Sequence, residues 1–295
     1  MMRLRSTIFA FGWCLLLTLT AAADEPAVKH RLMLIEYGER NRLVEVSADG
    51  KLTWEHPTVS VCVNFQPLAS GNVVYAYGGN PTGVQEVDRG HKIVWNYVSQ
   101  CHQVLGFERM ANGNTLLAEQ GPCRGVEVNP QGEVVSTVNM PTTEQDAHRQ
   151  ARRIHRLDNG HTLVAHEGEA AAREYDAQGK AVWEYRGVEN IYEARRLANG
   201  NTVIGCGTQE RVIEVTPDGK IAWEFTAADA PELNLTWITS VQPLKNGNLV
   251  VGNFLRGREG KGAHAFEVTR DKKVVWKFTD HDMIKTATMA NVLDD

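Results

Sequence analysis

The fold is decided by a short phrase that recurs along the chain, and its clearest copy reads Gly219-Lys220-Ile221-Ala222-Trp223-Glu224. Four more copies keep the order of a turn residue, Lys, two further residues and Trp: Gly50-Lys51-Leu52-Thr53-Trp54-Glu55, His91-Lys92-Ile93-Val94-Trp95-Asn96, Gly179-Lys180-Ala181-Val182-Trp183-Glu184 and Lys272-Lys273-Val274-Val275-Trp276-Lys277. A sixth copy, Gly132-Glu133-Val134-Val135-Ser136, has Ser in place of Trp. Strand-rich units that repeat every roughly 40–50 residues are typical of propellers and solenoids.

A second signal, Asn-Gly or a close variant, precedes the later copies of the phrase. It occurs as Ser70-Gly71-Asn72, Asn112-Gly113-Asn114, Asn159-Gly160-His161, Asn199-Gly200-Asn201 and Asn246-Gly247-Asn248. Asn-Gly between apolar runs predicts a tight hairpin turn, because both central residues need positive φ. Each unit is therefore predicted to contain four strands, A to D, with Asn-Gly joining A to B and Gly-Lys joining C to D.

The two ends of the chain indicate how many blades there are. Residues 30–56 supply only strands B, C and D, and residues 284–295 supply one strand A with nothing after it. The last strand can complete the first blade and so remove the exposed edges of an open sheet. We therefore predict an all-β, six-bladed β-propeller of four-stranded antiparallel blades, closed by the C-terminal strand. The expected blades are 284–295 with 30–56, then 59–98, 102–140, 149–186, 190–226 and 237–279.

The N-terminus is typical of a secretory signal peptide, predicted over residues 1–23. Arg3 and Arg5 are followed by the apolar run 8–19 and by Ala21-Ala22-Ala23. The run is too short for a stable membrane anchor, so residues 24–295 are expected to form one propeller domain, periplasmic or secreted. The net charge of −5 falls to about −7 without the signal, which argues against a nucleic-acid partner.

The repeat resembles a known family. The phrase Asn-Gly-Asn-Thr followed by Glu-Val, Asp-Gly-Lys and Trp-Glu is similar to the quinoprotein-like (PQQ-like) and arylsulfotransferase-like repeats of exported bacterial propellers. The resemblance covers nearly all of the mature chain and implies that the Trp residues of the phrase dock neighbouring blades. The resemblance does not imply a cofactor for this chain. No motif supports PQQ or a metal ion, and no cofactor is predicted.

Candidate site residues come from comparing the repeats with one another, because a position that differs between blades is a candidate for function. The end of strand B is polar or reactive in every unit: Glu36, Tyr77, Glu119, His166, Cys206 and Asn253. These side chains are predicted to form a ring at the central funnel. The start of strand A lies on the same face and adds Arg152, Arg153, Tyr192, Glu193 and Trp237, besides His102. Converging polar groups of this kind are typical of a small-molecule site.

Three functions are compatible with these residues. The first is an exported propeller that binds a small polar or anionic ligand, such as a saccharide, in its funnel. The second is a lyase-like or transferase-like enzyme in which His166 or His102 is the catalytic acid, base or nucleophile and Arg153 stabilises negative charge. The third is a scaffold for a protein partner. Arg153 and Glu193 occupy the same aligned position, so a lining of Arg–Glu pairs is an alternative to a binding site.

Four cysteines follow the signal: Cys62, Cys101, Cys123 and Cys206. None has the close spacing of a metal site. Cys101 and Cys123 are predicted at the same end of one blade, which makes them the candidate disulfide in an oxidising compartment.

Overall fold

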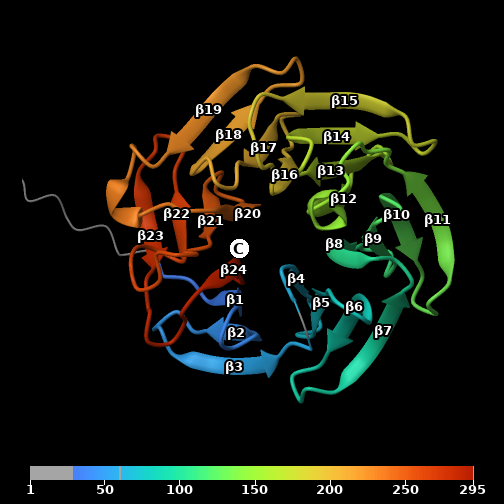
Figure 1. Ribbon diagram of the computed structural model, residues 1–295. Helices are drawn as coiled ribbons and strands as arrows, with labels where there is room; N and C mark the ends of the chain where they lie inside the picture. Colours follow the sequence, from blue (N-terminus) through green and yellow to red (C-terminus); the bar gives the residue numbers. More distant parts are fainter. Residues whose placement is uncertain (1–28, 60, 295) are drawn as a thin grey trace, which may run out of the picture.

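The structure, a computed structural model, describes residues 29–59 and 61–294. Within these residues, the strands form six four-stranded antiparallel sheets, arranged as blades around a central axis (Figure 1). The chain is therefore a six-bladed β-propeller, as the repeat predicts. The predicted signal peptide, residues 1–23, lies outside the described residues.

Each blade is built of four strands in order from the axis outward. Blades 1 to 3 are β24 (Ala287–Val292), β1 (Leu32–Glu36), β2 (Arg42–Val46), β3 (Leu52–Pro57); β4 (Phe65–Pro67), β5 (Val73–Tyr77), β6 (Thr82–Val87), β7 (Ile93–Ser99); and β8 (Gln103–Arg109), β9 (Thr115–Gln120), β10 (Arg124–Val128), β11 (Val134–Asn139). Blades 4 to 6 are β12 (Arg153–Arg156), β13 (Thr162–His166), β14 (Ala171–Tyr175), β15 (Ala181–Arg186); β16 (Glu193–Arg196), β17 (Thr202–Gly205), β18 (Arg211–Val215), β19 (Ile221–Thr226); and β20 (Ile238–Pro243), β21 (Leu249–Asn253), β22 (Ala265–Val268), β23 (Val274–Phe278). Two short 3₁₀ helices, η1 (Ala147–Arg149) and η2 (Pro231–Leu233), lie in the connections between blades.

The ring closes where the first and last strands meet. β24 pairs antiparallel with β1, from Leu32 opposite Val292 to Glu36 opposite Ala287. The backbone N–H of Leu293 also donates to Arg31 O at 2.9 Å. The prediction that the C-terminal strand completes the N-terminal blade is confirmed.

Apolar clusters fill the space between neighbouring blades, and each of the six interfaces has one. The interface of blades 5 and 6, for example, buries Val203, Phe225, Ile238 and Phe266 completely. The stability of the fold is therefore spread around the ring, since burial of apolar surface is its main driving force.

Four tryptophans of the repeated phrase fasten their blade to the next one along the chain. The indole Nε1 of Trp54, Trp95, Trp183 and Trp223 donates to a carbonyl in the C–D turn of the following blade, at 2.7–3.1 Å. An arginine lies over each of these rings, such as Arg196 over Trp183 at 4.8 Å from the centroid. The structural role implied for these tryptophans is thus confirmed.

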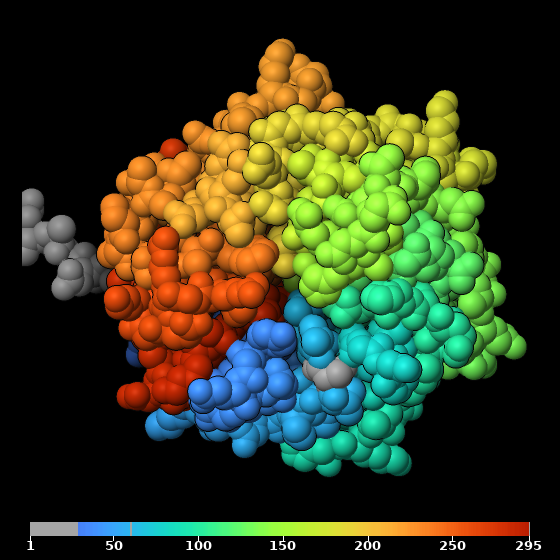
Figure 2. Space-filling model, viewed as in Figure 1, coloured from blue at the N-terminus to red at the C-terminus, as the bar shows by residue number. Residues whose placement is uncertain are grey.

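The innermost strands all run in the same sense along the axis, which gives the propeller two unlike faces. The connections between blades enter these strands on one face, which we name the upper face, and the Asn-Gly turns leave them on the other, the lower face. Figure 2 shows the upper face, which is hollowed near its centre.

Candidate functional site

A cavity of about 350 Å³ lies at the upper face, around the starts of the innermost strands. Part of its wall is aromatic: Tyr37, Phe254, Trp237 and Tyr192 follow one another with ring centroids 5.3–6.3 Å apart. These residues come from blades 1, 6 and 5, on connections that converge at the axis. Flat aromatic rings beside polar groups are the usual lining of a pocket for a small molecule.

The rest of the wall is mainly basic. Arg149, Arg152, Arg153 and Arg256 line the cavity, against the two carboxylates of Asp146 and Glu167. Arg152 is held in place, because its Nε donates to Glu167 and its guanidinium lies 4.6 Å from the ring centroid of Tyr192. Arg256 is exposed and makes no ion pair or hydrogen bond with any residue that the structure describes. The wall therefore carries an excess of positive charge, part of which is uncompensated.

His148 completes this wall as a neutral group. Burial, together with Arg152, lowers the pKa of His148 to about 4. Its Nδ1 lies 2.8 Å from Gln103 Oε1, so the ring links the connection before blade 4 to blade 3. At neutral pH it adds hydrogen-bonding capacity without charge.

Arg153 forms the floor of the cavity. Its side chain leaves β12 of blade 4 and crosses the axis, where Nη2 donates to Val63 O at 2.9 Å and to Thr239 O at 3.2 Å. Those two carbonyls lie in blades 2 and 6, across the ring from blade 4. Burial lowers the pKa of Arg153, and Glu193 opposes this effect.

Glu193 lies beneath Arg153, fully buried, and balances its charge. Its Oε2 is 3.4 Å from Arg153 Nε, and its Oε1 is 3.0 Å from His155 Nε2. Burial alone would raise the pKa of Glu193, but Arg195, His155 and Arg153 outweigh it and lower the pKa to about 2. Glu193 is thus an ionised anchor for its three basic neighbours, as the alternative of an Arg–Glu lining predicted.

Four of the predicted ligand-binding and catalytic residues lie together at the upper cavity, namely Arg152, Arg153, Tyr192 and Trp237. Sequence reasoning missed Tyr37, Arg149, Phe254 and Arg256, which also line it. These four lie in connections of unlike length and sequence, where aligning the repeats gives no position to compare.

The predicted ring at the ends of the B strands does not converge on the axis. Instead, these side chains hold the backbone that enters strand A of their own blade. Glu36 accepts from the N–H of Lys285, Asn253 Oδ1 accepts from the N–H of Thr236, and His166 Nδ1 donates to Gln150 O, at 2.8–2.9 Å. Each is therefore used within its blade, and none of these three lines the upper cavity.

The other three members of the predicted ring are likewise held by the residues packed around them, in their own blade or in the adjacent one. Glu119 accepts from Ser99 Oγ at 2.6 Å, and the hydroxyl of Tyr77 donates to Asn96 at 3.0 Å. Cys206 is buried in the apolar cluster between blades 4 and 5. The prediction that the six side chains form one funnel ring is corrected accordingly.

The three predicted catalytic residues are not brought together. His166 is fully buried, and burial together with Arg173 lowers its pKa to about 4. His102 lies on the exposed side of a separate cavity between blades 2 and 3, lined also by Asn80 and Gln103. Arg153 is the buried floor of the upper cavity. The structure therefore offers no shared site for the predicted acid–base chemistry.

The predicted disulfide between Cys101 and Cys123 is wrong, because all four cysteines of the described chain are free thiols. Cys101 packs against the cluster between blades 2 and 3, whereas Cys123 belongs to the cluster between blades 3 and 4. The two thiols thus lie against opposite faces of blade 3.

The fold and its channel define a PQQ-like β-propeller. The chain belongs to the family described as outer membrane protein assembly factor BamB, whose model matches residues 17–156 and 126–276. Among the described residues, no group of three or more His, Cys, Asp or Glu side chains is placed to hold a metal ion. No helix in residues 29–59 and 61–294 has the length and apolar character to cross a membrane.

Solved structures share the fold at low sequence identity. A protein of unknown function from Bacteroides caccae is 22% identical, with a TM-score of 0.80, over 91% of this chain and 100% of its own. Virginiamycin B lyase from Staphylococcus aureus is 11% identical, with a TM-score of 0.58, over 86% of this chain and 87% of its own. A protein from Desulfotomaculum acetoxidans is 12% identical, with a TM-score of 0.57, over 89% and 98%. These likenesses concern the fold alone. No curated protein matches the chain.

Proposed function

We propose that the upper cavity binds a small anionic molecule that has a ring, such as an acidic saccharide. The proposal is carried by one observation: Arg256 stands on the cavity wall beside the aromatic residues Trp237 and Phe254, and no carboxylate of the described residues pairs with it. An unpaired guanidinium at a partly enclosed site favours an anion, because charge-assisted hydrogen bonds to carboxylate or phosphate are stronger than neutral ones.

The aromatic wall supplies the second half of the recognition. A sugar or aryl ring can lie against Tyr37, Phe254, Trp237 or Tyr192 and bury apolar surface there. Arg152 is fixed by Glu167 and Tyr192 before a ligand arrives, so little side-chain entropy is lost when it donates to the ligand. The cavity volume of about 350 Å³ suits a monosaccharide-sized molecule.

Binding of glucuronate and of glucose, measured by isothermal titration calorimetry, tests the proposal, because the two share a ring and differ in charge. We expect glucuronate to bind at least about tenfold more tightly than glucose, and Arg256→Gln to weaken glucuronate binding by about tenfold. Lys261→Gln is the matched control, because Lys261 is an exposed cation on the same connection and does not line the cavity. Equal binding of the two sugars, or unchanged glucuronate binding in Arg256→Gln, would contradict the proposal.

A further inference from the structure

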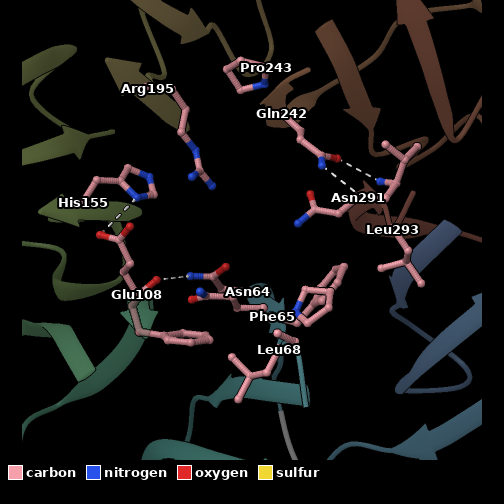
Figure 3. A pocket seen from close by; sticks show the side chains of 15 residues that line it. Asn64, Phe65, Leu68, Glu108, His155, Arg195, Gln242, Pro243, Asn291 and Leu293 are labelled. Carbon is pink, nitrogen blue, oxygen red and sulfur yellow. Dashed lines mark hydrogen bonds and ion pairs between the residues drawn. The ribbon is translucent and has the colours of Figure 1, made fainter. Parts of the chain in front are cut away.

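A second cavity, of about 440 Å³, lies at the lower face and has no lining residue in common with the upper one. It is surrounded by the ends of the innermost strands, which come from all six blades (Figure 3). Arg153 and Glu193 lie between the two cavities, at the positions where strands β12 and β16 begin. The two ends of the channel are therefore separate sites.

One aligned position dominates this lower cavity. In blades 2 to 6 it lies two residues before the residue whose backbone N–H donates across the Asn-Gly turn, as the N–H of Leu68 does to Asn72 O. In blade 1 it lies two residues before Leu293, whose N–H donates to Arg31 O. The six residues at this position are Gln66, Glu108, His155, Arg195, Gln242 and Asn291, and all of them line the cavity. All are polar, although their neighbours along the strands are largely apolar or paired. We name this set the lower ring.

Three members of the lower ring fasten neighbouring innermost strands together. Gln66 and Gln242 each accept from a backbone N–H of the next blade, those of Arg109 and Val292, at 2.8 Å. Each also donates to the carbonyl of the same residue, at 3.0 and 3.1 Å. Glu108 accepts from the N–H of Arg156 at 2.7 Å. These three side chains are therefore committed to the scaffold.

Arg195 and Asn291 are free of that task, and the sequence shows why. In the next blade, the position whose N–H would donate to the ring residue is occupied by proline. It is Pro243 for Arg195 and Pro67 for Asn291. Proline has no backbone N–H, so no buried donor there needs an acceptor from the ring. The position can then hold a side chain that only donates, as it does in Arg195.

Both side chains face the open centre of the cavity (Figure 3). Nε of Arg195 lies 3.4 Å from Glu193 Oε1, which fixes the base of the guanidinium, while its two terminal nitrogens have no partner among the described residues. The amide of Asn291 likewise makes no hydrogen bond with a described residue. The buried Nδ1 of His155 has no hydrogen-bond partner among the described residues and lies 3.8 Å from Glu108 Oε2.

We propose that the lower cavity binds a small carboxylate that bears a compact apolar group. The carboxylate accepts from the terminal nitrogens of Arg195 and from the Asn291 amide, and the apolar group lies against Phe65, Leu68 and Leu293. Glu193 repels such an anion little, because it is fully buried and already surrounded by Arg153, His155 and Arg195. This site is independent of the one proposed at the upper face.

Benzoate and benzamide are suitable probes, because they have the same shape and differ in charge. Calorimetric titration is expected to show benzoate binding at least about tenfold more tightly than benzamide. Arg195→Gln is expected to weaken benzoate binding by about tenfold or more, and Asn291→Leu by several-fold. Lys261→Gln, which removes an exposed charge outside both cavities, should leave benzoate binding unchanged.

Each other outcome overturns the proposal. If benzoate did not bind, or if benzamide bound equally well, the lower cavity would not be a site that selects a carboxylate. Loss of binding in Arg256→Gln with retention in Arg195→Gln would assign the probe to the upper cavity. Tighter binding of benzylammonium than of benzoate would mean that Glu108 selects a cation instead. Because Arg195→Gln could disturb Glu193, the Asn291→Leu variant, which touches no ion pair, decides the result if Arg195→Gln fails to fold.

Discussion

At the scale of single residues, the centre of the propeller is organised by charges that are fully withdrawn from water. Arg153 and Glu193 are both buried, and each has several partners from different blades. Desolvation of a buried ion pair costs free energy that only good geometry recovers, and removal of one partner is strongly destabilising. These residues therefore specify how blades 2, 4, 5 and 6 meet at the axis more than they add to overall stability.

His166 leads to a prediction about pH at the same scale. Burial, with Arg173, lowers its pKa to about 4 in the native state, compared with about 6.5 in an unfolded chain. Between these values the unfolded state binds a proton that the native state does not bind, so the free energy of unfolding falls as the pH falls from 6.5 to 4. The full loss is on the order of 3 kcal/mol.

The variant His166→Gln removes this titration and keeps groups that can hydrogen-bond to Gln150 and Tyr175. Urea unfolding at pH 7 and at pH 4.5 should therefore show a smaller loss of stability for the variant than for the unmodified protein. An equal loss in the two proteins would show that His166 does not carry the effect.

At the scale of elements, the repeats of the sequence match the repeats of the structure at residues that form turns or hold the backbone of a neighbouring strand. The Asn-Gly turns, the C–D turns and the docking tryptophans could all be predicted, because each has the same local role in every blade that contains it. The Trp phrase has lost its indole only in blade 3, where Ser136 stands. At the interface of blades 3 and 4 the Gly179 turn lies against the backbone of Asn139.

The site was less predictable from sequence, for a geometric reason. The polar residues at the ends of the B strands suggested a ring in the funnel. Side chains such as Asn253 instead point towards the segment that enters strand A of their blade and accept hydrogen bonds from its buried N–H groups. The lower ring is equally polar in all six repeats, so aligning the A strands could have found it. The upper cavity depends on residues such as Arg256 in connections that have no counterpart in other blades.

Gly179 and Gly219 give a matched test of how tightly the elements fit. Both have positive φ, +79° and +81°, in the C–D turns of adjacent blades. A Cβ at Gly219 would meet nothing within 4 Å, whereas one at Gly179 would lie 2.8 Å from Asn139 O. Alanine at either position should cost about 1–2 kcal/mol in backbone strain, and Gly179→Ala about 1–3 kcal/mol more through overlap.

Chemical denaturation of the two alanine variants measures this difference directly. Equal losses of stability would mean that the turn of blade 4 can move away from Asn139 without cost. Such a result would weaken the inference that this interface is closely fitted despite its missing Trp.

At the scale of the whole molecule, the propeller depends on a pair of strands that are about 250 residues apart in sequence. Met33 and Ile35 of β1 and Met289 of β24 are buried in one cluster with blade 2, and Ala287, Ala290 and Val292 are buried against blade 6. The closing strand thus contributes to the interfaces on both sides of blade 1. Because each blade contacts only its two neighbours, the ring of interfaces is complete only when β24 pairs with β1.

Removal of the closing strand should therefore have a global effect. A chain that ends at residue 283 is expected to lose cooperative thermal unfolding, because β1 loses its inner partner and two interfaces lose apolar contacts. Addition of a peptide of residues 284–294 should restore part of the transition in a concentration-dependent way. A truncated chain with an unchanged midpoint of thermal unfolding would show that closure contributes nothing.

The pairing of β1 with β24 also determines how the protein responds to mechanical load. Leu32 and Val292 form the first pair of this strand couple, and the chain leaves both strands at that same end. A force that pulls the two ends of the domain apart therefore acts on one hydrogen-bonded pair at a time, opening the couple from Leu32 towards Glu36 like a zipper. A shearing force would instead load all the hydrogen-bonded pairs at once. A propeller pulled by both ends is therefore expected to open at low force. A propeller held by one end only puts no load on this pair of strands.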